Sequence, residues 1–206
     1  MSQKNMLGRL MELILTVPGL WGTLVDLLEK LTGEARNLWI PALKKFLRKD
    51  NPWPPSTIIT ILRGRFHPVE FIGRGWRVSA NDTDRSSIDL SEIDLAKVQL
   101  VTMLKDEEVS ISGEEKLRRL KTSGYIRLDA DIFITLWENQ HLIPDAWKDK
   151  VKGDTKFIFF EGTVLKGLDG NRFVLYMYWL DGAWSYGVSW LDDDWDYDDL
   201  SAVIAA

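Results

Sequence analysis

Apolar side chains recur every three or four residues through the first quarter of the chain, the spacing of one face of an α-helix. Glycine-containing pairs divide this region into three amphipathic segments, over residues 7–15, 20–31 and 38–47. Pro41 falls inside the third segment and is expected to kink or split it, because proline removes a helical hydrogen bond. The pattern predicts a helical segment over residues 1–49.

A proline-rich stretch ends the helical pattern. Residues 50–56 read Asp-Asn-Pro-Trp-Pro-Pro-Ser, and each proline forces the residue before it away from helical backbone angles. Beyond this linker, residues 57–62, 69–78 and 97–104 are rich in β-branched and apolar side chains and predict strands. The polar residues 79–92 predict a loop.

Two further helices are predicted from their end signals. Ser112 and Glu115 have the spacing of a capping box at the start of the first helix, and Gly124 is a typical C-terminal stop. Asp129 is placed to cap the second helix, and Pro144 closes it. Both helices carry apolar side chains along one side.

The last third of the chain predicts a three-stranded antiparallel meander over residues 157–191. Its strands, over residues 157–165, 172–180 and 183–191, are joined by Asp-Gly pairs, the strongest short-range hairpin signal. A two-residue turn at Asp181 fixes the register and places eight residues on one face: Phe173, Leu175, Met177, Trp179, Trp184, Tyr186, Val188 and Trp190. A similar first turn adds Ile158, Phe160, Gly162 and Val164 to this face.

This apolar face requires a cover, and the two helices between residues 113 and 142 supply it most simply. We therefore predict an α+β protein, in which an N-terminal helical segment precedes a domain over residues 57–206. In that domain the antiparallel C-terminal meander packs on the two helices. The N-terminal segment docks either on the sheet or on another molecule.

The opposite face of the meander is mixed and is the candidate ligand surface. Tyr176 and Tyr178 form an aromatic shelf there, with Glu161, Thr163 and Ser185 beside it. Such a shelf suits a sugar, a nucleobase, a proline-rich peptide or another protein surface. The alternative is that the N-terminal helices or solvent cover this face. The assignment depends on the register, since a slip of one residue exchanges the two faces.

Composition excludes several classes of protein. The 206 residues include no cysteine and two histidines, which excludes a disulfide scaffold, thiolate zinc sites and a His-rich metal centre. With 45% apolar and 28% charged residues the chain is typical of a globular protein.

The longest uncharged run near the start covers residues 13–25. This run is too short for a membrane span, which needs ~20 residues. The chain is therefore predicted to be cytoplasmic.

The charges are distributed unevenly along the chain. The net charge is −5, yet basic side chains gather in residues 44–77, while seven aspartates and no basic residue follow Arg172. The basic stretch suggests a second hypothesis, a nucleic-acid-binding surface built from four arginines and an aromatic ring: Arg63, Arg65, Arg74, Arg77 and Trp76. The acidic balance of the whole chain argues against this hypothesis.

The aspartate run near the C-terminus suggests an alternative cation site. Asp192, Asp194, Asp196 and Asp198 alternate, so an extended segment would point their carboxylates to one side, an arrangement that suits calcium. The EF-hand pattern fails, because Tyr197 stands where glycine is required and Val203 where glutamate is required. A solvated acidic edge is the other interpretation.

No spacing in the sequence predicts a catalytic group or a cofactor. An enzyme with a carboxylate-based site remains a third hypothesis, since Glu70, Glu138, Glu161 or the aspartates can meet only through the fold. The first hypothesis is a non-catalytic binding or interaction module with a protein or small-molecule ligand. The sequence is also compatible with a homo-oligomer.

Three stretches of the chain resemble a set of small uncharacterised bacterial proteins. They cover residues 24–53, residues 113–147 and residues 157–195, with the motifs Lys-Lys-Phe-Leu-Arg-Lys-Asp-Asn-Pro-Trp, Leu-Trp-Glu-Asn-Gln-His-Leu-Ile-Pro-Asp-Ala-Trp and Trp-Leu-Asp-Asp-Asp-Trp. The resemblance is weakest over residues 57–100. It implies a bacterial, non-secreted protein, and it assigns no activity and no functional residue, because these conserved hypothetical proteins have none assigned.

Overall fold

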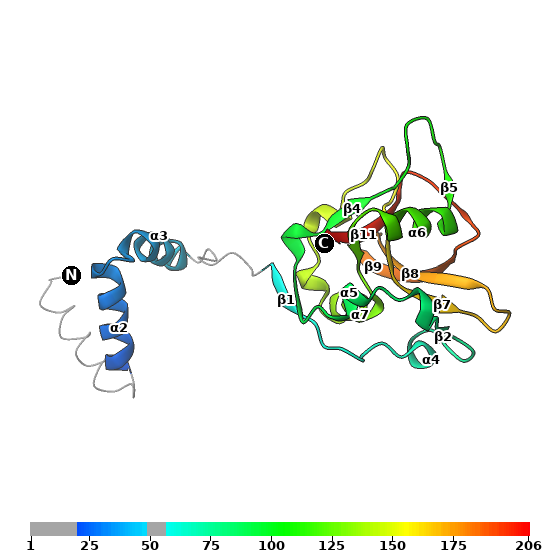
Figure 1. Cartoon of the computed structure of the whole chain (residues 1–206). Helices are drawn as coiled ribbons and strands as arrows, with labels where there is room; N and C mark the ends of the chain where they lie inside the picture. The colour runs from blue at the N-terminus through cyan, green and yellow to red at the C-terminus, as the bar shows by residue number, and fades with distance from the viewer. Residues whose placement is uncertain (1–19, 49–56) are drawn as a thin grey trace, which may run out of the picture. The chain divides into compact units, whose positions relative to one another are not determined.

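The computed structural model describes residues 20–48 and 57–206 (Figure 1). The chain divides into two compact units, Met1–Pro55 and Ser56–Ala206. The predicted helix over residues 7–15 and the predicted linker over residues 50–56 lie outside the described residues. None of the described helices has the length and hydropathy that crossing a bilayer requires.

The first unit contains two helices, α2 (Leu20–Thr32) and α3 (Arg36–Leu47). Pro41 lies within α3, which continues through it, so the expected split does not occur. The Lys30 ammonium lies 4.9 Å from the centroid of the Trp39 ring, across the turn that joins the two helices. This cation–π contact ties the helical pair together.

The second unit is built on a seven-stranded sheet in which β4, β11, β7, β8 and β9 follow one another, while β2 also pairs with β7 and β6 with β11. The predicted strands of the meander are present as β7, β8 and β9. The seven strands are β2 (Arg77–Val78), β4 (Gln99–Val101), β6 (Tyr125–Arg127), β7 (Phe157–Lys166), β8 (Arg172–Leu180), β9 (Ala183–Trp190) and β11 (Asp199–Ala205). Two small sheets pair β1 (Ile58–Thr60) with β3 (Glu92–Asp94) and β5 (Ile111–Ser112) with β10 (Asp194–Trp195).

The strand β11 was not anticipated from the sequence, and it is central. It lies between β4 and β7 and runs parallel to β7, with Asp199 opposite Phe157 and Ser201 opposite Phe159. Four consecutive residues of β11, 200–203, are buried. The end of the aspartate run therefore enters the interior of the sheet.

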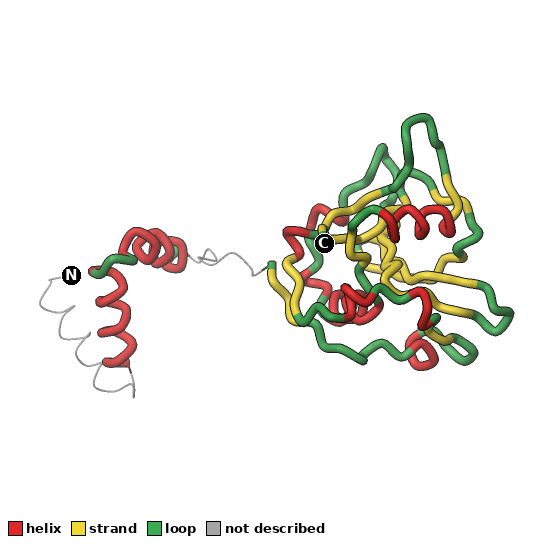
Figure 2. Tube along the Cα trace, in the orientation of Figure 1, coloured by secondary structure: helices red, strands yellow, loops and turns green. Residues whose placement is uncertain are grey.

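The helices α6 (Gly113–Thr122) and α7 (Ala130–Glu138) begin at their predicted caps. They cover opposite faces of the sheet, whereas the sequence analysis placed both over one face (Figure 1). Phe133 of α7 packs in the core that contains Phe160, and Leu117 of α6 packs in the core that contains Phe159. Figure 2 shows the strands gathered between the helical segments. Two covered faces explain why central strands are apolar on both sides.

The predicted register holds for β8 and β9 and fails for part of β7. Trp179 pairs with Trp184 and Met177 with Tyr186, as the two-residue turn requires. The pairing of β7 with β8 shifts between Phe159 and Val164. Val164 faces the α6 side, together with Val174, and not the side of Trp179 as predicted. The predicted two-residue turn at Asp169 is wrong, because Lys166 pairs with Arg172 and the Gly167 N–H donates to the Asn171 carbonyl, so that the loop holds three residues, 168–170. The extra loop residue exchanges the faces of the adjoining part of β7, and the shift beyond Val164 returns Ile158 to the predicted face beside Met177.

The segment between β1 and β4 differs from the predicted strands and loop. Residues 69–78 form a strand only at β2, and the loop over residues 79–92 contains helical turns. Strand β4 is shorter than the predicted 97–104 and only half-buried. The short helices are α4 (Pro68–Phe71), η1 (Ala80–Asp82), α5 (Arg85–Ile88) and η2 (Leu95–Lys97), followed later in the chain by η3 (Gln140–Leu142) and η4 (Asp145–Lys148). Pro68 at the first position of α4 favours the helix over a strand.

We predict that Gly162→Ala lowers the free energy of unfolding by about 1–3 kcal/mol, the usual effect of overpacking. A methyl group at Gly162 would clash with the backbone carbonyls of Arg127 and Leu128, which cannot move independently of β6. Urea denaturation measures the change. Gly22→Ala is the control, because nothing lies within 4 Å of its added methyl. Equal stability of Gly162→Ala and wild type would contradict the close approach of β6 and β7.

Candidate functional site

Three half-buried aromatic rings lie together on the α6 side of the sheet. Phe157 of β7 lies 5.6 Å from Tyr176 and 5.3 Å from Tyr178, and the two tyrosine rings of β8 are 5.9 Å apart, all between ring centroids. We call these three residues the aromatic triad. Phe157 and Tyr178 are direct cross-strand partners, which explains the contact. Phe157 was missed in the sequence analysis, because the bulge in β7 shifts the predicted pairing.

Small residues of β9 border the triad. Ser185 pairs with Tyr178, and Gly187 pairs with Tyr176. The Tyr176 ring lies across Gly187, where an added Cβ would be 2.6 Å from the tyrosine oxygen. The absence of a side chain at Gly187 therefore sets the position of the Tyr176 ring.

The structure separates the other two predicted shelf residues from the triad. Glu161 is fully buried, and its Oε1 accepts a hydrogen bond of 2.6 Å from the hydroxyl of Ser201. Thr163 is buried as well, and its hydroxyl oxygen accepts a hydrogen bond of 3.1 Å from the backbone N–H of Ala130, at the start of α7. The sequence-predicted residues that lie together are therefore Tyr176, Tyr178 and Ser185.

A buried cation lies on the same side of the sheet as the triad. The side chain of Lys116, on α6, is fully buried and donates a hydrogen bond of 2.5 Å from Nζ to the backbone carbonyl of Asp199. Its ammonium lies 5.6 Å from the ring centroid of Phe159 and 5.2 Å from that of Trp195. Burial lowers the pKa of Lys116, and the nearby Glu161 and Asp199 carboxylates oppose that shift.

Two buried polar atoms close to this cation lack a hydrogen-bond partner within the described part of the chain. They are Oε2 of Glu161 and Nε1 of Trp195. An unsatisfied buried acceptor is costly, and a nearby positive charge reduces that cost. The attraction between Lys116 and the Glu161 carboxylate thus contributes to the stability of the α6 side of the core.

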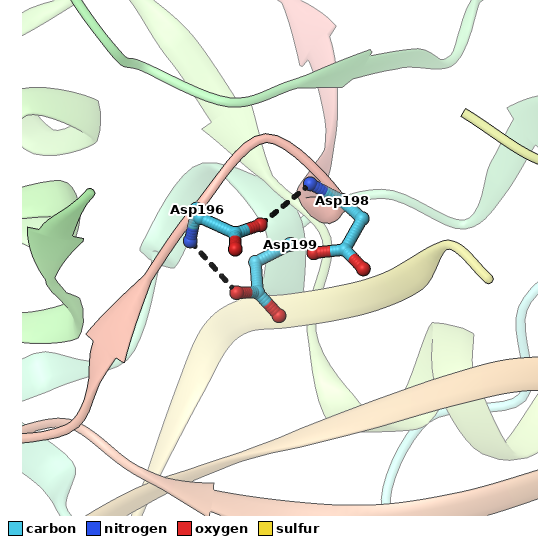
Figure 3. Close-up of side chains that lie close together, drawn as sticks. All are labelled: Asp196, Asp198 and Asp199. Carbon is cyan, nitrogen blue, oxygen red and sulfur yellow. Dashed lines mark hydrogen bonds between the residues drawn. The ribbon is translucent and has the colours of Figure 1, made fainter. Parts of the chain in front are cut away.

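Three carboxylates meet at the turn before β11 (Figure 3). Oxygens of Asp196, Asp198 and Asp199 lie within 4.8 Å of one another. The Asp196 N–H donates to Oδ2 of Asp199 at 2.9 Å, and the Asp198 N–H donates to Oδ1 of Asp196 at 3.1 Å. We call these three residues the aspartate cluster.

The aspartate cluster differs from the site suggested by the alternating pattern. The chain turns at Asp196 and is not extended, so Asp192 and Asp194 stay exposed and apart from it. Asp196 and Asp198 of the predicted set lie together, and Asp199 completes the cluster. Calcium and magnesium prefer oxygen ligands such as these carboxylates. Among the described residues, these three aspartates have the geometry that suits a cation.

The aspartates of the cluster have divergent pKa values. Burial, followed by the hydrogen bond with Asp196, raises the pKa of Asp198 to about 7. The same hydrogen bond lowers the pKa of Asp196. Burial also raises the pKa of Asp199. Asp196 is therefore the more acidic member of the pair, and Asp198 is the more easily protonated one.

The aspartate cluster is linked to the triad through Asp199. Asp199 is the β11 partner of Phe157, and the two side chains lie on the same face of the sheet. Burial raises the pKa of the Tyr176 hydroxyl, and the Tyr178 and Asp199 side chains raise it further. Aromatic rings and carboxylates thus occupy one continuous surface. The position of Asp199 beside Phe157 had no signal in the sequence, because parallel pairing joins strands without a local turn.

The five residues of the nucleic-acid hypothesis are not equally available. Arg63 donates to the Asp129 carboxylate at 2.7 Å and to the backbone carbonyls of Ser87 and Leu90. Arg65 forms an ion pair of 2.7 Å with Glu138. These two arginines stabilise the start and end of α7.

The remaining members of that hypothesis lie near β2. Arg74 and Arg77 are exposed. Trp76 is half-buried, and its ring packs edge-on against Phe173 with centroids 4.8 Å apart. The aromatic ring therefore belongs to the core rather than to an open stacking surface.

Comparison of the chain with protein-family models, with curated proteins and with solved structures gives no match. The resemblance to a set of bacterial proteins stays a prediction.

We predict that Lys116→Met lowers the free energy of unfolding by about 1–3 kcal/mol, the cost of leaving a buried acceptor unsatisfied. The Asp199 carbonyl loses its donor, and Glu161 loses a neighbouring cation. Adding Glu161→Gln is expected to restore part of the loss, because it removes the buried negative charge. Urea denaturation measures both variants. Lys121→Met, on the exposed side of α6, is the control, and a loss as large as that of Lys116→Met would refute this account.

We predict that Asp198→Asn flattens the dependence of stability on pH. An acid whose pKa is higher in the folded chain than in the unfolded chain favours the fold only while it is protonated. The contribution of Asp198 is present below its ordinary pKa of 3.8 and is lost as the pH rises through about 7. Denaturation across this range is therefore expected to show a fall in wild type that Asp198→Asn reduces. The exposed Asp192→Asn is the control; a similar effect of both substitutions would argue against the raised pKa of Asp198.

Proposed function

We propose that this protein is a non-catalytic binding module that holds an arginine or lysine side chain of a partner protein on the aromatic triad. The observation that carries the proposal is the position of Asp199 beside Phe157, which joins the half-exposed rings to the aspartate cluster. A cytoplasmic location, expected from the sequence, is part of the proposal.

The chemistry of this surface favours a cation. The face of an aromatic ring carries partial negative charge and attracts ammonium and guanidinium groups. The carboxylates of the aspartate cluster add a formal negative charge close to the rings. Lys116, the cation on the same side of the sheet, is buried and already engaged by Asp199, Phe159 and Trp195. A ligand cation therefore meets rings and carboxylates at the surface without a competing exposed ammonium from Lys116.

We expect Nα-acetyl-arginine amide to shift the NMR signals of Phe157, Tyr176, Tyr178 and Ser185 in the full chain. The uncharged Nα-acetyl-citrulline amide, which has nearly the same shape, is expected to bind less tightly. Tyr178→Leu removes a ring face and is expected to weaken binding about 2- to 5-fold, since an exposed cation–π contact contributes about 0.5–1 kcal/mol.

Tyr178→Phe is the matched control, because it keeps the ring and is expected to keep the affinity. Equal binding of the arginine and citrulline compounds would show that charge is not recognised. Shifts confined to residues away from the triad would place the ligand elsewhere. Either result would refute the proposed function.

A further inference from the structure

The strand β9 forms one edge of the large sheet. Its eight residues pair with β8 without a break in register, from Ala183 opposite Leu180 to Trp190 opposite Phe173. The opposite edge is formed by β4, which has three residues. Edge strands are usually short, bulged or charged, because their free backbone groups recruit other strands. The strand β9 has none of these protections: it contains no charged residue and no proline.

The turn that begins β9 determines which backbone groups are free. Asp181 and Gly182 have φ angles of 51° and 82°, as a two-residue type I′ turn requires. Alternate residues from Ala183 onward then bond to β8, and the N–H of Leu191 indeed donates to Arg172. Tyr186 and Val188 therefore point their N–H and C=O groups away from β8. Across the described ranges, 20–48 and 57–206, no hydrogen bond to these groups is found.

The charges at the two ends of β9 indicate what kind of strand fits this edge. Exposed Asp181 precedes β9, and exposed Asp192, Asp193 and Asp194 follow it. A second copy of β9 in antiparallel pairing would place these acidic ends against each other, which is unfavourable. A segment with an uncharged middle and basic ends has the complementary charge.

The side chains of β9 leave a path from its edge to the aromatic triad. Ser185, Gly187 and Ser189 lie on the triad side of the strand and are small. Neighbouring strands are about 4.8 Å apart, so a strand added to β9 lies about 10 Å from β8. A long arginine or lysine side chain spans much of that distance over the small residues.

We propose that the partner binds as an added β-strand along β9, through an extended segment with an uncharged middle and basic ends. Backbone hydrogen bonds to Tyr186 and Val188 supply affinity, and a basic side chain lying over Ser185 and Gly187 reaches the triad. This inference rests on the proposed function for the identity of the cation. It adds the conformation of the partner and a second part of the binding surface.

The test uses the full chain and the synthetic peptide acetyl-Arg-Thr-Val-Thr-Val-Thr-Arg amide. Binding is expected to slow hydrogen exchange at the N–H groups of Tyr186 and Val188. Two methylated peptides are the matched controls, one methylated on the valine nitrogens and the other on the threonine nitrogens. In an added strand, the N–H groups of alternate residues point toward β9. Methylation of the set of nitrogens that faces β9 is therefore expected to abolish binding, and methylation of the other set is expected to leave binding largely intact.

The charge requirement is tested on the protein. Asp181→Asn combined with Asp192→Asn is expected to weaken the peptide about 2- to 10-fold, as for the loss of two exposed charge pairs. Asp106→Asn combined with Glu107→Gln is the control, because it changes the net charge equally at exposed positions away from β9. Equal weakening by both pairs would mean that only the net charge matters and would overturn the proposal.

The outcomes separate this inference from the proposed function. If the arginine compound binds the triad while both methylated peptides bind as well as the parent, strand addition is wrong and the proposed function stands. If the purified protein sediments as a dimer with Tyr186 and Val188 already protected from exchange, a second copy occupies the edge and the inference is overturned. If no peptide slows exchange at these two residues, it is also overturned.

Discussion

The parallel pairing of β11 with β7 is the constraint on which the rest of this structure depends. It places the last strand of the chain inside the sheet, so that both faces need a cover and α6 and α7 take one face each. The same pairing brings Asp199 beside Phe157 and Ser201 within reach of Glu161. The strand β11 therefore joins the acidic part of the candidate surface, the aspartate cluster, to its aromatic part, the triad.

The α6 side of the core combines apolar packing with charge. Lys116 lies fully buried beside the stacked rings of Phe159 and Trp195 and donates to the backbone of β11, while Glu161 remains near it with one oxygen unpartnered among the described residues. These groups hold α6 to the two central strands, because neither charge can be removed alone without leaving the other uncompensated. Phe157 and Tyr176 of the half-buried triad pack against this layer through the core that contains Phe159.

Local signals explain the parts of the fold that were predicted correctly. Ser112 and Asp129 begin α6 and α7 because their side chains accept hydrogen bonds from the first helical turn, an interaction within four residues. The Asp-Gly turn at 181–182 fixes the register of β8 and β9 because it leaves no freedom in the pairing. The loop between β7 and β8 holds one residue more than its Asp-Gly pair predicts, and this extra residue moved Val164 to the other face. Thr163 lies in the irregular part of β7, which has no local signal, and it bonds to the start of α7. Of the predicted shelf, Tyr176, Tyr178 and Ser185 lie together because the register of β8 and β9 holds, while Glu161 is buried and bonded to Ser201.

The sequence by itself determined the α+β class, the two capped helices and the meander, since each depends on periodicity or on contacts between near neighbours in the chain. It also determined that negative charge gathers after Arg172. Only the tertiary structure decided where that charge lies: a run that reads as an alternating acidic edge turns at Asp196 and ends in a central strand. The parallel pairing of β11 and the burial of Lys116 depend on contacts between segments that are distant in the sequence. The open edge of β9 reflects the absence of such a contact among the described residues. Such contacts are set by which surfaces remain to be covered once the local elements have formed, and no residue pattern within a single segment specifies them.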